Sequence, residues 1–343
     1  MLRVVLRFTN LVVLTLLALS FFSFVLIYLF PGEPLANLSG IPNPSPQEIE
    51  QLQHLYHRDS VFIVQYWYYL IDLFSGNWGL SFSSGLSLSS EVARTLPASI
   101  ELSTYALLLS FIVGLPLGFL AGLRHHKTTD YALLSVSVLG YSIPVFWLAM
   151  LLILGFSLQL GWFPLSGRIS LLYEVPRISG FILLDILWSD IENKSDVFID
   201  AVRHLILPTL SIAAFTTTII LRIMRRSFIE TMNSDYVQAA VARGLTSRQV
   251  IWKHAIRNSL MPILPLLGMQ FTTLLTNAMI VEVIFSWPGI GNWLIQAIYQ
   301  RDYPAIRVGM LAVATLVVIF TMTIDLFLRL VDPKKSKVER VAI

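Results

Sequence analysis

The chain has 343 residues, of which 55% are hydrophobic and 13% are charged, and its mean hydropathy is +0.71. Soluble domains carry about 25% charged residues, so this composition excludes an ordinary soluble protein and indicates one that lies in a lipid bilayer. The absence of cysteine excludes disulfides and thiolate metal sites. The net charge of +3 is too small to indicate nucleic-acid binding, and we expect no nucleic-acid partner.

The first predicted element is a membrane-spanning helix over residues 9–30. Arg3 and Arg7 precede this apolar run, as basic residues precede the core of a signal peptide. The run is about 20 residues long, which is enough to cross ~30 Å of hydrocarbon. No clear small-residue cleavage site precedes Pro31, so we interpret the run as a retained first helix.

A long segment outside the membrane follows, over residues 31–98. It contains a proline-rich stretch at 41–46 and an aromatic stretch at 54–74. The aromatic stretch predicts a helix that lies at the membrane interface without spanning it. The serine-rich run at 81–90 predicts a turn or loop without chemistry.

Five further apolar runs are long enough to cross the bilayer. They occupy residues 99–123, 131–160, 205–224, 261–284 and 306–330. Pro116 and Pro144 predict kinks within the second and third spans. The sequence therefore predicts an all-α integral membrane protein with six transmembrane helices and with both termini on one side.

Charge asymmetry between the loops gives the orientation. One side of the membrane comprises the N-terminus, the turn at 124–130, the segment at 222–258 and the tail from residue 329. These regions hold sixteen of the 24 lysines and arginines but only five of the 21 acidic residues. Because positively charged loops remain in the cytoplasm, we expect both termini to be cytoplasmic.

The sequence lacks the motifs of several enzyme classes. It has no G-x-x-x-x-G-K-[ST] loop to hold ATP phosphates, no H-E-x-x-H zinc pair and no G-x-S-x-G nucleophile elbow. A metal pair at His125 and His126 is the alternative to a solvated basic turn, which the neighbouring Arg124 and Lys127 favour. We therefore expect no catalytic residue and no metal site.

An ion-coupled secondary carrier is a rival class. Such a carrier needs inverted repeats or ionisable residues near the midplane of the membrane. No repeat is visible, and Glu101, Glu282 and Asp325 all lie near the ends of predicted spans. A membrane hydrolase is a second rival, but no nucleophile and base stand at a suitable spacing.

The cytoplasmic segment at 235–258 has the signals of a helical hairpin. Asp235 with Gln238 predicts the start of a first helix, and Gly244 suits the left-handed position that ends it. Thr246 with Gln249 forms a capping-box pattern that opens a second helix.

Small residues between these signals indicate what the hairpin does. Ala239, Ala240 and Ala242 let another surface approach the backbone closely. We interpret the basic hairpin as a docking element, with a solvated linker as the alternative.

The same residues resemble a known family. Gln238, Ala239 and Ala240 followed by Gly244 resemble the Glu-Ala-Ala-x-x-x-Gly loop of ABC importer permeases, which docks into a cleft of the ATPase subunit. Gln238 stands where the family usually has glutamate. The stretch at 254–262 places its proline farther from the glycine, as is usual in the dipeptide and oligopeptide branch.

Other motifs resemble that branch along the whole chain. They are Gly76-Asn-Trp-Gly-Leu-Ser81, Leu96-Pro97 before Glu101-Leu102, Ser142-Ile-Pro-Val-Phe-Trp147, Phe285-Ser-Trp-Pro-Gly-Ile-Gly291 and Asp302-Tyr-Pro304. Within the branch, the residues at 171–175, 180–181 and 188–190 are most similar to the B-type permease of the Sap system. That system is linked to peptide uptake, to antimicrobial-peptide resistance and, in some bacteria, to putrescine export.

This resemblance implies a type I ABC importer permease fold in the bacterial inner membrane. It divides the chain into residues 1–94, an ABC transmembrane type-1 domain at 95–331 and a basic cytoplasmic tail at 332–343. It implies a second homologous permease chain, two ATPase subunits that bind ATP and Mg²⁺, and an external substrate-binding protein. This chain itself is expected to bind no cofactor.

Two sets of residues within the spans bear on transport. Gly114, Gly118 and Gly122 form a stripe of small residues, for which we favour close helix packing in lipid over substrate contact. Gln270, Thr273 and Asn277 share one face of the fifth span, where polar side chains turn toward a partner helix or a water-filled pathway. We take this stripe as a candidate pathway lining.

The resulting prediction is a permease that moves peptides across the inner membrane by alternating access, driven by ATPase subunits on other chains. A putrescine export permease of the same architecture is the alternative.

Overall fold

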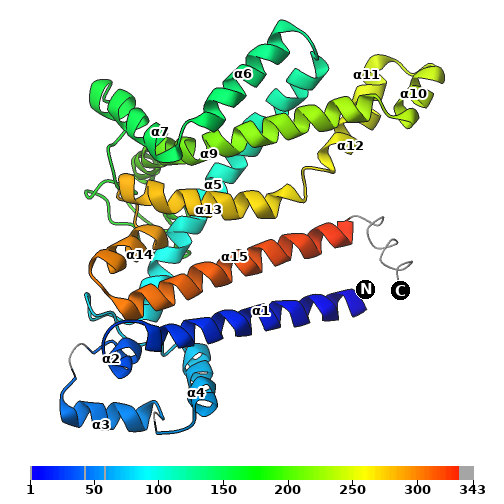
Figure 1. The fold of residues 1–343 in the computed structure, drawn as a ribbon. Helices are drawn as coiled ribbons and strands as arrows, with labels where there is room; N and C mark the ends of the chain where they lie inside the picture. Colours follow the sequence, from blue (N-terminus) through cyan, green and yellow to red (C-terminus); the bar gives the residue numbers. More distant parts are fainter. Residues whose placement is uncertain (1, 42–43, 58, 332–343) are drawn as a thin grey trace. The chain divides into compact units, whose positions relative to one another are not determined.

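The computed structural model describes residues 2–41, 44–57 and 59–331, and every regular element within them is a helix (Figure 1). The chain forms two compact units. Unit 1 comprises Met1–Ser99 with Pro288–Met322, and unit 2 comprises Ile100–Trp287 with Thr323–Ile343. The predicted basic tail at 332–343 lies outside the described residues.

Unit 1 is built from the two ends of the chain. Its elements are α1 Leu2–Leu29, α2 Pro34–Ser39, α3 Pro46–Leu55, α4 Phe62–Ser75, the start of α5 Leu88–Leu123, α14 Ile290–Tyr299 and most of α15 Tyr303–Val331. The prediction of a single helix over residues 54–74 is therefore wrong, because α3 ends at Leu55 and α4 begins at Phe62. The chain is interrupted between α3 and α4, where His57 has a left-handed backbone with φ of 50°.

Helices α1 and α4 pack through aromatic rings. Phe24 on α1 and Tyr69 on α4 are buried, with ring centroids 5.3 Å apart. Hydroxyl pairs lie beside these rings, since Ser20 Oγ is 2.8 Å from Tyr66 Oη and Ser23 Oγ is 3.0 Å from Tyr69 Oη. The tyrosines therefore satisfy their polar ends on α1 while burying their rings.

A second cluster in unit 1 is organised by Asp302, whose side chain is fully buried. Its Oδ2 accepts hydrogen bonds from Ser81 Oγ at 2.6 Å, from Ser83 N at 3.0 Å and from Ser83 Oγ at 2.9 Å. Its Oδ1 accepts from Ala305 N at 3.1 Å, at the start of α15. Ser81 and Ser83, in the run expected to be a loop without chemistry, thus bind the carboxylate of Asp302. Helix α5 begins within the same run, at Leu88.

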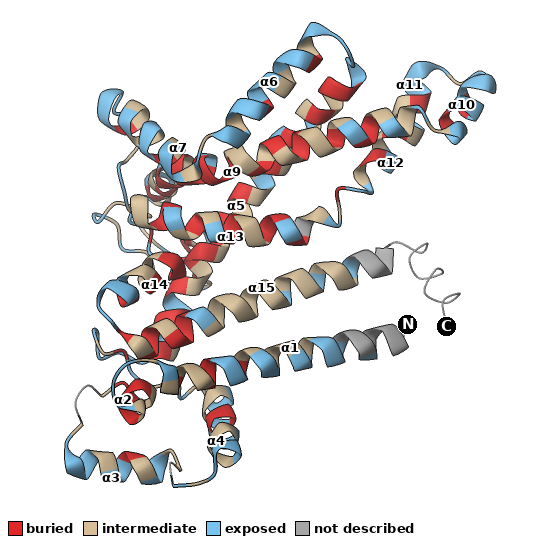
Figure 2. Cartoon of the chain, in the orientation of Figure 1, coloured by how far each residue is buried: buried red, intermediate tan, exposed pale blue. Residues whose placement is uncertain are grey.

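Unit 2 is arranged around α9 Lys194–Met232, which is buried along much of its length (Figure 2). Helices α6, α7, α8, α12 and α13 all contact it. The other elements of unit 2 are α6 Thr128–Ser142, α7 Val145–Leu152, the π-helical η1 Ile153–Gln159, α8 Ile182–Trp188, α10 Asp235–Ala242, α11 Ser247–Val250, the π-helical η2 Ile251–Ala255, α12 Ile256–Leu260 and α13 Leu266–Ile284.

Four described helices are long and apolar enough to cross a membrane, or five if one bent pair counts as a single span. The four segments are Thr9–Leu29, Leu88–Leu123, Lys194–Met232 and Tyr303–Phe327. The bent pair takes the place of the single helix, kinked at Pro144, that was expected at 131–160, because the chain turns by 99° between Thr128–Ser142 and Val145–Gln159. Ile143 and Pro144 are both extended, as the backbone before and at a proline often is.

The fifth predicted span is shorter than expected. Residues 261–265 form turns, and α13 begins only at Leu266, after Pro262 and Pro265. Each proline lacks the amide hydrogen that a helix interior needs. The apolar part of this helix is Gly268–Ile284.

Candidate functional site

The hairpin predicted to dock another subunit follows α9 directly. Its first helix is α10, and its N-cap is Ser234, with φ of −76° and ψ of 150°. The cap expected at Asp235 is therefore displaced by one residue, and Asp235 occupies the first helical turn. Gln238 Nε2 instead donates to Asn233 O at 3.3 Å, which ties α10 back to the end of α9.

A glycine ends α10 as expected. Gly244 has φ of 83°, and its amide donates to Val241 O at 2.9 Å. The Leu245 amide donates to Ala240 O at 3.3 Å, which completes a Schellman motif. A Cβ atom on Gly244 would meet nothing within 4 Å, so the position faces open space.

The second helix of the hairpin opens with the predicted capping box. Gln249 N donates to Thr246 Oγ1 at 3.4 Å, and Thr246 N donates to Gln249 Oε1 at 3.0 Å. These reciprocal bonds satisfy two amides that the helix itself leaves unpaired.

The three alanines have different environments. Ala240 is buried with Val237 and Val250 in the small core of the hairpin, whereas Ala239 and Ala242 are exposed. Only the two exposed alanines can meet another surface. Ala240 lies three residues after Val237, on the inner face of the helix.

The hairpin is attached to the end of α9 and to the short helix α12. Ser227 Oγ on α9 donates to Ser259 O on α12 at 2.8 Å, and both serines are buried. Asn258 Nδ2 donates to Tyr236 Oη on α10 at 3.1 Å. Hydrogen bonds therefore join α12 both to α9 and to α10.

The outer surface of the hairpin combines exposed apolar side chains with cations. Tyr236, Val241 and Trp252 are 46%, 55% and 67% exposed. The exposed basic residues are Arg243, Arg248, Lys253 and Arg257.

The predicted glycine stripe faces α9. A Cβ atom on Gly114 would lie 3.0 Å from Thr217 O, and one on Gly118 would lie 2.5 Å from Leu221 O. A Cβ atom on Gly122 would lie 2.8 Å from the ring of Phe228. These distances leave no room for a side chain, so α5 and α9 approach each other at their backbones.

The polar stripe on α13 is partly buried. Gln270 is 7% exposed, and its Oε1 has no hydrogen-bond partner among the described residues. Thr273 Oγ1 donates to Met269 O at 3.1 Å within the helix, and Asn277 is half-buried. Gln270 is therefore the member with an unmet polar atom.

Sequence reasoning missed two buried ion pairs in unit 2. Arg225 on α9 donates through Nε and Nη2 to the two oxygens of fully buried Asp130, at 2.6 and 2.7 Å. His125 Nδ1 lies 3.2 Å from the same carboxylate, so this histidine belongs to an ion-pair cluster. The described residues contain no group of three or more histidine, aspartate or glutamate side chains that could hold a metal ion.

The second pair joins Glu101 on α5 to Arg168 in the loop after η1. Arg168 donates through Nε at 3.0 Å and also through Nη2, and Glu101 is fully buried. Leu183 N donates to Glu101 Oε1 at 3.4 Å. Glu101 is thus held in an ion pair, and only the arginine 67 residues away in sequence could have indicated it.

Comparisons with known proteins agree with this arrangement. The family described as "Binding-protein-dependent transport system inner membrane component" matches residues 114–337, and the N-terminal family of the same membrane component matches residues 1–102. The chain is 39% identical to the di/tripeptide transport system permease protein DppB of Pseudomonas aeruginosa, over 97% of this chain and 98% of that protein. It is 39% identical to the putrescine export system permease protein SapB of Escherichia coli K12 and 35% identical to the dipeptide transport system permease protein DppB of the same strain. Both matches cover 97% of this chain, with 97% of SapB and 98% of DppB. The chain therefore belongs to the family of inner membrane components of binding-protein-dependent transport systems.

Proposed function

We propose that this chain is the permease subunit of an ABC transporter that moves peptides across the bacterial inner membrane by alternating access. The observation that carries this proposal is its 39% identity, over nearly its whole length, to a di/tripeptide permease. The hairpin supports it, because the sequence has no phosphate-binding loop and the hairpin exposes apolar and basic side chains to which an ATPase subunit can bind.

The proposed architecture has six transmembrane helices in a type I importer fold, with both termini cytoplasmic. The bent pair α6–α7 and the shorter α13 each count as one span in this arrangement. A second homologous permease chain, two ATPase subunits that bind ATP and Mg²⁺, and an external substrate-binding protein complete the transporter.

In this proposal, the hairpin couples ATP hydrolysis to the spans. The coupling residues are Asp235, Gln238, Ala239, Ala240, Gly244, Thr246 and Gln249. Closure of the ATPase subunits moves the hairpin, and the hairpin moves α9 and α13. Gln270, Thr273 and Asn277 on α13 are the proposed pathway lining.

A glycine substitution tests the coupling role. Gly244→Arg places a long side chain on the outer surface of the hairpin, and we expect the complex to lose its ATPase subunits on purification and to lose peptide uptake. Gly161→Arg is the matched control, because Gly161 also has a positive φ, 64°, and also faces open space. Retention of the ATPase subunits by Gly244→Arg at normal membrane abundance would contradict the docking role.

Putrescine export is the second candidate, because the SapB relative is named for it. Uptake of labelled dipeptides and efflux of labelled putrescine are to be measured in the same cells expressing the whole complex. ATP-dependent dipeptide uptake that is lost in Gly244→Arg supports the first proposal. A response of putrescine efflux alone would transfer the assignment to export.

A further inference from the structure

Helix α4 has one face on which large apolar side chains are exposed. Ile63, Trp67, Ile71 and Phe74 are 73%, 63%, 48% and 86% exposed. Their spacing of four, four and three residues places them on one side of the helix. Asp72 is the only charged residue of α4.

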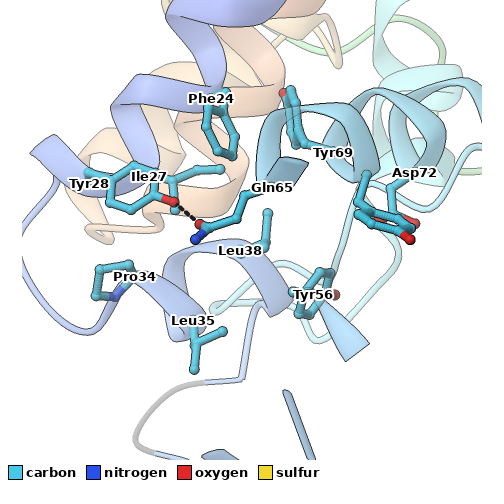
Figure 3. A pocket seen from close by; sticks show the side chains of 11 residues that line it. Phe24, Ile27, Tyr28, Pro34, Leu35, Leu38, Tyr56, Gln65, Tyr69 and Asp72 are labelled. Carbon is cyan, nitrogen blue, oxygen red and sulfur yellow. Dashed lines mark hydrogen bonds between the residues drawn. The ribbon is translucent and has the colours of Figure 1, made fainter. Parts of the chain in front are cut away.

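The polar groups of α4 are used on its other face. Tyr28 on α1 donates a hydrogen bond to Gln65 Oε1, and Gln65 Nε2 donates to Ser60 O at 2.7 Å. Figure 3 shows Gln65, Tyr69 and Asp72 around a pocket that α1 and α2 also line. Gln65, Tyr69 and Asp72 thus lie on the inner face of α4, and its outward face carries apolar residues.

The contacts of α4 with α1 set its depth in the membrane. The rings of Phe62, Tyr66 and Tyr69 surround Phe24, with centroids 5.1, 5.5 and 5.3 Å from it. Phe24 stands five residues before Leu29, where the apolar span of α1 ends, so the crossing lies ~8 Å inside the span at about 1.5 Å per residue.

One contact reaches deeper. Tyr66 Oη donates to Leu17 O at 3.1 Å, and Leu17 stands twelve residues before Leu29, or ~18 Å along the helix. This bond is made by the tip of the long Tyr66 side chain, which reaches to about the middle of the span, whereas the rings around Phe24 keep α4 itself nearer the Leu29 end. At that level α1 is within the hydrocarbon that it spans, so α4 beside it does not lie in bulk water.

The element before α4 has the opposite character. Helix α3 carries Glu48 and Glu50, and its first turn is closed by a capping box from Ser45. Charged side chains and an exposed cap suit water. The boundary between water and hydrocarbon therefore falls between α3 and α4, in the segment at 56–61.

We propose that α4 is an in-plane membrane helix, embedded in the leaflet at the Leu29 end of α1, with Ile63, Trp67, Ile71 and Phe74 in contact with lipid acyl chains. Figure 1 shows α4 running crosswise to α1, as an in-plane helix beside a spanning one does. With the termini cytoplasmic, this is the outer leaflet. The helix anchors the external segment of unit 1 at a fixed height beside α1.

Spin labelling tests the proposal directly, because the chain contains no cysteine. Labels at Ile63→Cys, Trp67→Cys and Phe74→Cys are to be studied in the assembled complex, with cysteine-free partner chains, in phospholipid vesicles. Leu14→Cys is the lipid control, since Leu14 is 68% exposed on α1. Gln51→Cys on the exposed side of α3 is the water control. Collisions with oxygen report hydrocarbon, and collisions with a water-soluble nickel complex report solvent.

The three α4 labels are expected to behave like Leu14→Cys, with oxygen collisions several-fold more frequent than nickel collisions. The ratio is expected to be alike at the three positions, because an in-plane helix keeps one depth. Nickel collisions at the level of Gln51→Cys would overturn the proposal in favour of water. Exclusion of both reagents would overturn it in favour of a protein partner, either the binding protein or the second permease chain.

A second measurement needs no cysteine variant or spin label, so it tests the proposal even if the labelled variants do not fold. Lipids brominated along their acyl chains are expected to quench part of the tryptophan fluorescence of the wild type. In Trp67→Phe this quenched part is expected to be smaller. An equal quenched fraction in both proteins would contradict the lipid contact.

Discussion

Asp302 joins two segments that are far apart in sequence through one carboxylate. Its oxygens accept three hydrogen bonds from Ser81 and Ser83, and a fourth caps α15. Hydrogen bonds to a charged group contribute about 1.5–3 kcal/mol each. The start of the last long helix therefore depends on serines that precede α5.

Replacement of Asp302 by alanine is expected to destabilise the protein by about 2–4 kcal/mol, because the buried hydroxyl of Ser81 and the part-buried donors of Ser83 lose their acceptor. Thermal unfolding in detergent measures this change. Ser87→Ala is the control, since Ser87 is exposed and its Oγ makes a hydrogen bond to Ser89 Oγ at the surface, and it is expected to stay within about 0.5 kcal/mol of wild type. Equal unfolding temperatures for Asp302→Ala and wild type would contradict this role.

Glu48 makes the first turn of α3 sensitive to pH. The Ser45 backbone amide donates to its carboxylate at 2.7 Å and lowers the pKa of Glu48 below its ordinary value. A group whose pKa is lowered on folding stabilises the fold above its unfolded pKa, and this contribution is lost as the pH falls through the folded pKa.

Hydrogen exchange of the amides in the first turn of α3 checks this prediction. Protection is expected to persist at neutral pH and to fall in acid, once rates are corrected for intrinsic chemistry. In Glu48→Gln the protection is expected to be independent of pH, because an amide oxygen accepts the bond in either condition. A pH dependence that survives in Glu48→Gln would assign the effect to another group.

At the scale of elements, the close contact between α5 and α9 depends on glycines, which have no side chain. Gly118→Ala puts a methyl group 2.5 Å from Leu221 O, and we expect a loss of about 1–3 kcal/mol as the helices separate. Gly155→Ala is the matched control, because a Cβ there meets nothing within 4 Å. Thermal unfolding of the two variants compares them, and a Gly118→Ala variant as stable as Gly155→Ala would show that α5 and α9 can move apart freely.

Prolines show how far the sequence can predict these elements. Pro144 was expected to kink a helix and in fact separates two helices by 99°. Pro116 and Pro208 lie within continuous helices. The residue type is the same, and packing decides the outcome, because α6 and α7 each contact α9 on their own.

Local sequence patterns correctly predicted the features that depend only on neighbouring residues. The capping box at Thr246 and the left-handed Gly244 need only a few residues on either side, and both are present. Asp130 with Arg225 and Glu101 with Arg168 are pairs separated by 95 and 67 residues. No periodicity links such partners, so the sequence alone could not reveal them.

At the scale of the whole molecule, the chain has several long apolar helices and an exposed basic hairpin, and its sequence has no phosphate-binding loop. The purified chain alone is therefore expected to release no phosphate from ATP above background. Hydrolysis is expected only when the ATPase subunits are added, measured as phosphate release in proteoliposomes. Sustained hydrolysis by the isolated chain, at a rate proportional to its own concentration, would contradict the prediction that ATP is hydrolysed by separate ATPase subunits.

The length of α9 has a mechanical consequence. Its 39 residues form one helix, which at about 1.5 Å per residue is ~58 Å long. The hairpin follows the Met232 end of α9, and Ser227 near that end donates a hydrogen bond to Ser259. If α9 tilted as one body about this end, its far end at Lys194 would move about 1 Å for each degree of tilt. In the coupling that we propose, a tilt of a few degrees at the hairpin would thus displace Lys194 by about the length of a side chain.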